Sequence, residues 1–168
     1  MTEHADDPLE RITLRPQRDG DTGFLRRLYA GTRADELSRL PWTEEEKQSF
    51  LTMQFEAQTR HYSSYYADAE LLVIEDAAGP IGRLYLQRRD DEIRVVDIAL
   101  LPEHRGRGIG SALMQRVLEE ARRTGIACRI HVEAANPALH LYRRLGFRQV
   151  DESGVYLLME WRQDGSVR

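Results

Sequence analysis

Short runs in which apolar residues alternate with polar ones, or follow one another, recur along the chain and predict strands. The first covers residues 11–16, and three more follow in close succession at about 71–76, 80–88 and 92–100. The segments between these three carry Ala-Gly-Pro and Asp-Asp-Glu, residues typical of tight turns. Because the connections are so short, we expect these three strands to form an antiparallel meander.

The stretch between the first and second strands predicts two helices. Residues 20–33 should form a short helix that closes near Gly31. Residues 43–62 open with Thr43 three positions before Glu46, the pattern of a capping box, in which each side chain bonds the backbone N–H of the other residue. We therefore expect two helices before the chain returns to the sheet.

The most regular helix is predicted over residues 108–124. Its apolar residues recur every three or four positions and so share one face; they are Leu113, Met114, Val117, Leu118 and Ala121. Gly125 then provides a typical helix end. Beyond it we expect a strand at 127–134, a short helix at 137–145 and two final strands, FRQV and VYLLMEW.

The order of these elements, β-α-α-β-β-β-α-β-α-β-β, predicts an α/β fold. We expect a mixed, mostly antiparallel central sheet of about seven strands, flanked by about four helices. With 168 residues, 41% of them hydrophobic and 31% charged, the chain is the right size for one domain with its own core. That domain should span residues 11–168, after a disordered N-terminal arm of residues 1–10.

Composition and charge narrow the class of protein. No run approaches the ~20 apolar residues of a membrane helix, and the acidic N-terminus MTEHADDPLE is neither a secretory signal nor a basic transit peptide. A net charge of −4 argues against nucleic-acid binding and favours a cationic amine as partner. The single cysteine, Cys128, excludes an intramolecular disulfide, is expected in the core and indicates a cytoplasmic protein. No metal site is predicted.

Residues 105–110 read Arg-Gly-Arg-Gly-Ile-Gly and lie between a predicted strand and a predicted amphipathic helix. Three glycines in five positions allow the backbone to pass close to a bulky group and to turn several N–H donors in one direction. The start of the helix adds unpaired N–H groups and the positive end of its dipole. Arg105 and Arg107 add positive charge suited to phosphate oxygens. The loop therefore predicts a phosphate-bearing ligand.

Two common glycine-rich loops do not match this segment. A P-loop requires Lys-Ser or Lys-Thr at its end, and the chain contains neither pair. A dinucleotide loop requires Gly-x-Gly-x-x-Gly, but its last position is Ser111 when counted from Gly106 and Leu113 when counted from Gly108. The phosphate ligand is therefore expected to be neither a P-loop nucleotide nor a Rossmann-bound dinucleotide.

The pattern that does match is Arg/Gln-x-x-Gly-x-Gly/Ala, met by Arg105, Gly108 and Gly110, and it resembles the pyrophosphate loop of the GNAT acetyltransferase superfamily. A second block, NPALHLYRRLGF at 136–147, is similar to that family's Asn-x-x-Ala-x-x-Leu-Tyr-x-x-x-Gly-Phe segment, with Ala138 matching only approximately. The resemblance covers roughly residues 70–161 and implies a GNAT-like fold that holds acetyl-coenzyme A as acyl donor, without a metal.

The resemblance also implies which residues contact the acetyl-CoA. The strand before the loop is expected to separate from its parallel neighbour, so that its backbone pairs with the pantetheine arm as another strand would. Asn136 should cap a short helix and contact the same arm. The complete set of expected cofactor contacts is Ile98, Ala99, Leu100, Arg105, Gly106, Arg107, Gly108, Ile109, Gly110, Ser111, Asn136 and Tyr142.

Acetyl transfer to an amine requires an acid for the leaving thiolate and a route for the amine's proton. Tyr142, at the family's thiol-contacting position, is the expected acid, with simple packing as the alternative. Asp97, in an apolar strand, and His131, on the polar side of its strand, are the candidate bases. The alternatives are an ion pair of Asp97 with Arg83 and an exposed strand histidine. Asp97 is preferred, and Glu133 is a weaker third candidate.

We therefore expect an acetyl-CoA-dependent N-acetyltransferase in which a primary amine of a small molecule or peptide attacks the thioester directly, rather than through Cys128. The alternative is a non-catalytic acyl-CoA-binding or regulatory module of the same fold. A homodimer is compatible with the sequence. Residues 20–66 carry no recognisable code for the acceptor. Their aromatic residues are expected to pack, with lining of an acceptor pocket as the alternative; they are Phe50, Phe55, Tyr62, Tyr65 and Tyr66.

Overall fold

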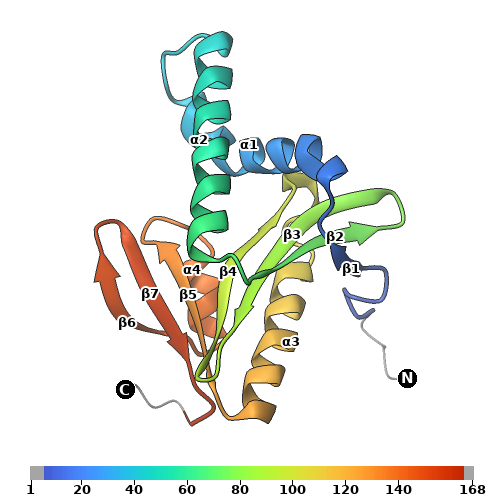
Figure 1. The fold of residues 1–168 in the computed structure, drawn as a ribbon, viewed down its shortest axis with the longest axis vertical. Coiled ribbons are helices and arrows are strands. Elements are labelled where there is room, and N and C mark those ends of the chain that lie inside the picture. Colours follow the sequence, from blue (N-terminus) through green and yellow to red (C-terminus); the bar gives the residue numbers. More distant parts are fainter. Residues whose placement is uncertain (1–5, 165–168) are drawn as a thin grey trace.

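A single sheet of seven strands forms the centre of the computed structural model, which describes residues 6–164 (Figure 1). The strands lie in the order β1-β2-β3-β4-β5-β7-β6, and every neighbouring pair is antiparallel except β4 with β5. They are β1 (Thr13–Pro16), β2 (Glu70–Asp76), β3 (Gly79–Arg88), β4 (Glu92–Leu100), β5 (Ala127–Glu133), β6 (Arg148–Ser153) and β7 (Tyr156–Trp161). The predicted mixed, mostly antiparallel α/β fold is confirmed, including the β2–β3–β4 meander.

Four α-helices accompany the sheet within the described residues: α1 (Thr22–Ser38), α2 (Glu44–Tyr65), α3 (Ile109–Thr124) and α4 (Leu139–Arg144). Two single 3-10 turns, Asp19–Asp21 and Pro102–His104, precede α1 and α3. α3 and α4 share the larger core with one set of strand side chains, whereas α1 and α2 pack with Val73, which points to the opposite face. The sheet therefore separates two layers of helices.

Helix α3 shows the predicted amphipathic arrangement. All five residues of its predicted apolar face are buried. Gly125 closes the helix with a φ of 72°, in the left-handed region that glycine adopts without strain. The hydrophobic pattern was sufficient here because the whole apolar stripe faces one sheet surface.

Helix α1 differs from its prediction because it does not close at Gly31 but continues to Ser38. Gly31 has no positive φ, so it is an ordinary helical residue. Its role is close packing: a Cβ at this position would lie 3.2 Å from Cδ of Pro102, at the end of β4. The expected end near Gly31 was therefore wrong, since the glycine makes room for the neighbouring loop.

Helix α2 begins with the predicted capping box. The Thr43 hydroxyl accepts from the Glu46 backbone N–H at 3.1 Å, and the Thr43 N–H donates to Oε2 of Glu46 at 2.8 Å. From this start the N-terminal half of α2 and the α1–α2 connection rise away from the sheet, and the C-terminal end of α2 returns to it (Figure 1).

Residues 1–5 of the predicted N-terminal arm lie outside the described residues. Residues 7–10 form a hydrogen-bonded turn, in which the Glu10 N–H donates to the Asp7 carbonyl at 3.0 Å. Leu9 is 6% exposed and packs in the larger core. None of the helices in the described part of the chain has both the length and the apolar character that a membrane crossing requires.

Candidate active site

The parallel pairing between β4 and β5 stops halfway along β4. It joins Glu92–Val95 to Ala127–Ile130 and goes no further, although β5 continues to pair with β7 as far as Glu133. Residues Val96–Leu100 of β4 therefore have no strand partner on the β5 side, and we call this side the open edge. It contains Ile98, Ala99 and Leu100, as expected from the sequence, and the 3-10 turn Pro102–His104 connects it to the glycine-rich loop.

A β-bulge lies where the open edge begins. Tyr85 pairs with Asp97 and Leu86 with Val95, so Val96 is an extra residue in β4. A bulge bends the strand and reverses the alternation of its side chains. Before the bulge Val95 packs in the α3 core; after it Ile98 packs there, and Asp97 points to the opposite face. The bulge thus brings Asp97 to the same face as Arg94.

The glycine-rich loop has the backbone conformation that its sequence predicts. Gly106 has a φ of 72° and Gly108 a φ of 82°, both in the left-handed region. Gly108 is the N-cap of α3 and provides no side chain to satisfy the first N–H groups of the helix. A Cβ at Gly110 would meet nothing within 4 Å. An uncapped helix start with open space beside it suits an anionic group.

The two loop arginines have different surroundings. Arg105 donates from Nε to the Leu100 carbonyl at 3.0 Å, which ties the loop to the end of β4. Arg107 lies in a hollow between the loop and the N-terminal turn, together with Asp6, Asp7 and Glu10. Arg105 therefore has a structural contact, and Arg107 lines a hollow that contains both acidic and basic side chains.

Tyr142 and Asn136 lie at α4. Asn136 accepts from the Ala138 N–H through Oδ1 at 2.9 Å, so it caps the turn that leads into the helix. Tyr142 is 5% exposed, and its ring packs against Phe147 with centroids 5.8 Å apart. Burial raises the pKa of Tyr142, and the charge of the Asp97 carboxylate raises it further. The phenol is therefore protonated throughout the neutral range.

Asp97 forms the ion pair that was the alternative to a catalytic base. Nε of Arg83 donates to Oδ2 of Asp97 at 2.6 Å, and Nη2 of Arg83 donates to Oε1 of Gln58 at 2.9 Å. The guanidinium is 4.8 Å from the centre of the Tyr85 ring and 5.6 Å from that of Tyr62. This pairing removes the reason for preferring Asp97 as the base, because the carboxylate already balances the charge of the buried Arg83 guanidinium.

His131 is exposed on β5 and contacts Arg94, with Nη1 of Arg94 2.9 Å from Nδ1 of the imidazole. Partial desolvation by its neighbours lowers the pKa of the His131 imidazole, and the positive charge of Arg94 lowers it further. Glu133 lies two residues further along β5, beside Tyr156. Burial raises the pKa of Tyr156, and the Glu133 carboxylate contributes to that rise.

Arg94 belongs to a polar network that the sequence analysis did not find. Two buried carboxylates hold the network together: Glu92 bonds Arg89, Arg94 and Arg129, and Glu160 bonds Arg129 and Arg162. Alternation in EIRV places Glu92 and Arg94 on one side of the strand, which was the available signal. The partners from β5 and β7 are distant in sequence, so the network itself was not predictable.

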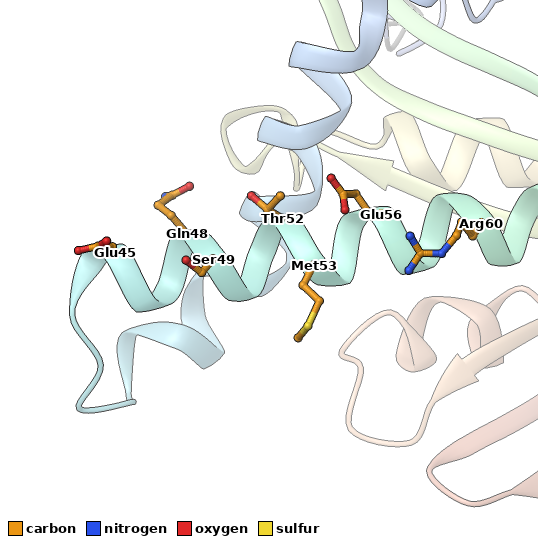
Figure 2. Close-up of a pocket in the computed structure, with 7 residues that line it drawn as sticks. All are labelled: Glu45, Gln48, Ser49, Thr52, Met53, Glu56 and Arg60. Carbon is orange, nitrogen blue, oxygen red and sulfur yellow. The ribbon is translucent and has the colours of Figure 1, made fainter.

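Cys128 is buried, and burial raises the pKa of its thiol to about 12. Over residues 6–164 no group of three or more His, Cys, Asp or Glu side chains could hold a metal ion. A shallow hollow along α2 is lined only by that helix, as Figure 2 shows; its residues are Glu45, Gln48, Ser49, Thr52, Met53, Glu56 and Arg60. This hollow contains no residue of β4, the glycine-rich loop or α4, and so it is separate from the site.

Comparison with known proteins agrees with this geometry. The family model described as the acetyltransferase (GNAT) domain matches residues 67–149, which include the open edge, the glycine-rich loop and Tyr142. This part of the chain therefore carries the features of a GNAT acetyltransferase domain.

Solved structures with the same fold include PaiA N-acetyltransferase from Thermoplasma acidophilum in complex with coenzyme A. It has a TM-score of 0.67 and 20% sequence identity, covering 90% of this chain and 98% of that one. Spermidine N-acetyltransferase from Vibrio cholerae, in complex with CoA and spermine, has a TM-score of 0.60 and 23% identity over 92% and 97% of the two chains. At these identities the likeness establishes the fold alone.

Two sequence relatives are also acetyltransferases. Streptothricin acetyltransferase from Streptomyces lavendulae is 41% identical over 61 residues, which cover 34% of this chain and 32% of the relative. Mycothiol acetyltransferase from Corynebacterium glutamicum is 30% identical over 97 residues, covering 56% and 33%. The chain thus spans about a third of the length of these curated relatives.

Proposed function

We propose that this chain is an acetyl-CoA-dependent N-acetyltransferase that transfers the acetyl group directly to a primary amine of a small molecule or peptide. The observation that carries this proposal is the open edge of β4, which is followed by one 3-10 turn, the glycine-rich loop and then the uncapped start of α3. An unpaired strand edge suits the amide groups of pantetheine, and the helix start suits the pyrophosphate. The two features together match one ligand that is both an amide chain and a phosphate ester.

In this proposal Ile98, Ala99 and Leu100 pair with pantetheine through their backbone, and Asn136 contacts the same arm. The pyrophosphate binds the N–H groups of the loop; the residues that surround it are Arg105, Gly106, Arg107, Gly108, Ile109, Gly110 and Ser111. Tyr142 donates its proton to the thiolate as coenzyme A leaves. Its buried, protonated phenol supports that role.

The acceptor amine must lose a proton during the reaction. An amine of pKa ~10.4 is neutral in only about one molecule in ~2,500 at pH 7, an uphill step of roughly 4–5 kcal/mol. Asp97 is paired with Arg83, and Nδ1 of His131 is engaged by Arg94. We therefore propose that the proton leaves to solvent through water rather than to either side chain. Direct attack is also supported by Cys128, whose buried, protonated thiol is a poor nucleophile.

The comparisons support an amine as the acceptor but do not identify which amine. One structural neighbour contains spermine, and the sequence relatives are named for streptothricin and mycothiol. These compounds differ widely in chemical structure, so the acceptor does not follow from the family. We further propose that residues 11–168 act as one domain, and that the protein works in the cytoplasm, where a lone reduced cysteine is common.

The experiment that tests the function is a screen of amines with acetyl-CoA, measured as free thiol released. Polyamines, amino acids, aminoglycosides and peptide N-termini are each added to the purified protein. We expect one class to raise thiol release well above the rate with acetyl-CoA alone, and mass spectrometry to show the acetylated amine. Binding of acetyl-CoA without transfer to any of the four classes would instead indicate a non-catalytic module.

A further inference from the structure

Arg94 and His131 make a contact across the two parallel strands, at the last pairs before the open edge begins. Arg94 pairs in register with Arg129, and His131 follows two positions later on β5. Nη1 of Arg94 lies 2.9 Å from Nδ1 of His131. A guanidinium has only donors and does not lose its proton in proteins, so Nδ1 must be the acceptor. The contact therefore defines which imidazole nitrogen carries the lone pair.

The guanidinium of Arg94 is held in this position from the other side. Its Nη2 donates to both carboxylate oxygens of Glu92 at 3.3 Å, and the Arg94 side chain is only 12% exposed. Glu92 is itself 4% exposed and is bonded by Arg89 and Arg129 at 3.1 Å each. A buried, multiply bonded carboxylate restricts the arginine to one orientation. Nη1 is thus directed at His131 by the fold.

The tautomer of His131 follows from this orientation. A neutral imidazole has one N–H and one lone pair. With the lone pair of Nδ1 engaged by Arg94, the proton must lie on Nε2, on the far side of the ring. Such a ring can donate a hydrogen bond from Nε2 but has no free lone pair with which to take a proton from an amine.

We propose that Arg94 is a positioning residue that keeps His131 as a neutral Nε2–H donor for an oxygen atom of the bound reactants, and that His131 is not the general base. The oxygen is either that of the thioester, which gains charge during attack, or one on the acceptor. This inference rests on the proposed acetyl transfer, because only that reaction brings such an oxygen to the open edge.

The charges around His131 support a neutral ring. Partial desolvation and Arg94 lower the pKa of His131, while Glu92 on β4 and Asp151 on β6 act in the opposite direction, and the net shift is downward. Asp97, beyond the bulge on β4, is paired with Arg83. Because the ring becomes cationic only below the ordinary range for histidine, it is a neutral donor at neutral pH.

The first test is the tautomer in the wild-type protein, measured by long-range ¹⁵N–¹H NMR with labelled histidine. The His131 signal is assigned as the one missing from His131→Gln. We expect the Nε2–H tautomer and a titration midpoint below that of an unperturbed imidazole. An Nδ1–H tautomer, or a midpoint at or above the ordinary value, would overturn the proposal. This measurement needs no acceptor, so it stands even if acetyl transfer is not found.

The second test removes Arg94. In Arg94→Met, the His131 midpoint should rise and the tautomers should mix, because both the donor and the positive charge are gone. Arg129→Gln is the matched control: it removes another guanidinium from Glu92 but leaves the contact with His131. If Arg94→Met does not fold, the tautomer measured in the wild-type protein still tests the proposal. An Arg94→Met protein that folds and titrates as wild type would refute the positioning role.

The third test separates donor from base in the transfer reaction. His131→Gln retains an N–H donor without a titrating group, and His131→Phe retains neither. If His131 acts as a donor, His131→Phe should lower kcat/KM roughly 10²-fold, and His131→Gln should lower it much less. The acidic limb of the kcat/KM profile should stay in place for His131→Gln. A fall in kcat in His131→Phe identifies the thioester oxygen, and a rise in the acceptor KM identifies the acceptor. Equal losses in both variants, with loss of the acidic limb, would show a base instead.

Discussion

The hydroxyl of Tyr142 is protonated for a physical reason that packing alone provides. The ring is buried against Phe147, and both burial and the nearby Asp97 charge disfavour the phenolate. Packing and acid catalysis are therefore compatible at this residue, since the same burial that makes it a core residue keeps its proton available for a leaving thiolate.

Replacing Tyr142 by phenylalanine keeps the ring and removes only the hydroxyl. We expect kcat to fall about 10–100-fold, within the range for one positioned proton donor. Acetyl-CoA binding and the melting temperature should change little, because the buried ring remains. The measurement is thiol release at saturating acetyl-CoA, with binding checked separately. Unchanged turnover, where chemistry limits the rate, would assign Tyr142 to packing only.

Replacing Asp97 is expected to change the stability of the fold more than proton transfer. In Asp97→Asn, the Arg83 guanidinium, only 6% exposed, loses its countercharge. We expect a loss of about 2–3 kcal/mol in the free energy of unfolding, below the ~3–5 kcal/mol for a fully buried pair, because the carboxylate is partly exposed. Chemical denaturation measures this. The acidic limb of kcat/KM should remain.

A matched control for that variant is Asp35→Asn, which breaks an exposed pair between α1 and Arg39, the residue after its end. Such pairs contribute little, so its stability should equal that of wild type. If Asp97→Asn were as stable as this control and also lacked the acidic limb, Asp97 would regain its place as the candidate base.

Among the elements, β4, α3 and the segment that joins them form the proposed acetyl-CoA site. The bulge at Val96 and the end of pairing after Val95 create the open edge, and the glycines turn the chain into the helix within a few residues. The hydrogen bond from Arg105 to the Leu100 carbonyl holds the loop against the end of β4. Strand, loop and helix thus act as one unit for a ligand that is half amide chain and half phosphate.

Gly110 tests this unit, because a Cβ there meets nothing and its φ is not positive. Gly110→Asp should leave the melting temperature of the free protein unchanged or slightly higher, since a carboxylate at a helix start is favourable. It should abolish the rise in melting temperature on adding acetyl-CoA, by placing bulk and negative charge at the phosphates.

Gly110→Asn serves as the control of equal size without charge. It should retain weakened stabilisation by acetyl-CoA, which thermal denaturation over a range of concentrations would show. If Gly110→Asp bound acetyl-CoA as wild type does, the pyrophosphate would have to bind elsewhere than at the start of α3.

For the whole molecule, the sheet separates the α3–α4 layer, which carries the phosphate loop and Tyr142, from the α1–α2 layer, which covers Arg83 and Asp97. A donor bound along β4 would contact β4, the glycine-rich loop and α4, and the core behind them contains residues from both halves of the chain. Its binding should therefore stabilise the entire fold rather than one segment.

Acetyl-CoA is expected to raise the melting temperature in a concentration-dependent way, because at 100 times its dissociation constant it adds about 2.7 kcal/mol to the free energy of unfolding. NAD and ATP, whose loop patterns are absent, should have no comparable effect. Differential scanning fluorimetry with the three ligands measures this. Equal stabilisation by NAD would contradict an acetyl-CoA site.

Local patterns were sufficient for much of the fold. The α3 face, the Thr43–Glu46 capping box and the β2–β4 meander depend on residues close together in the chain, and all three are confirmed. The end of α1 was wrong, because whether Gly31 closes a helix or admits Pro102 depends on a loop seventy residues away.

The sequence by itself determined the resemblance to the acetyltransferase family, the glycine-rich loop before α3 and the place of Tyr142 in a short helix, because these depend on residue types at short, regular spacings. Only the tertiary structure decided the state of Asp97 and His131. Strict alternation would place Asp97 with Val95 beneath α3, but the bulge turns it towards Arg83. His131 receives its partner from β4, thirty-seven residues earlier. Bulges and parallel pairings are settled by packing between distant segments, and so they determine which polar side chains remain free for chemistry.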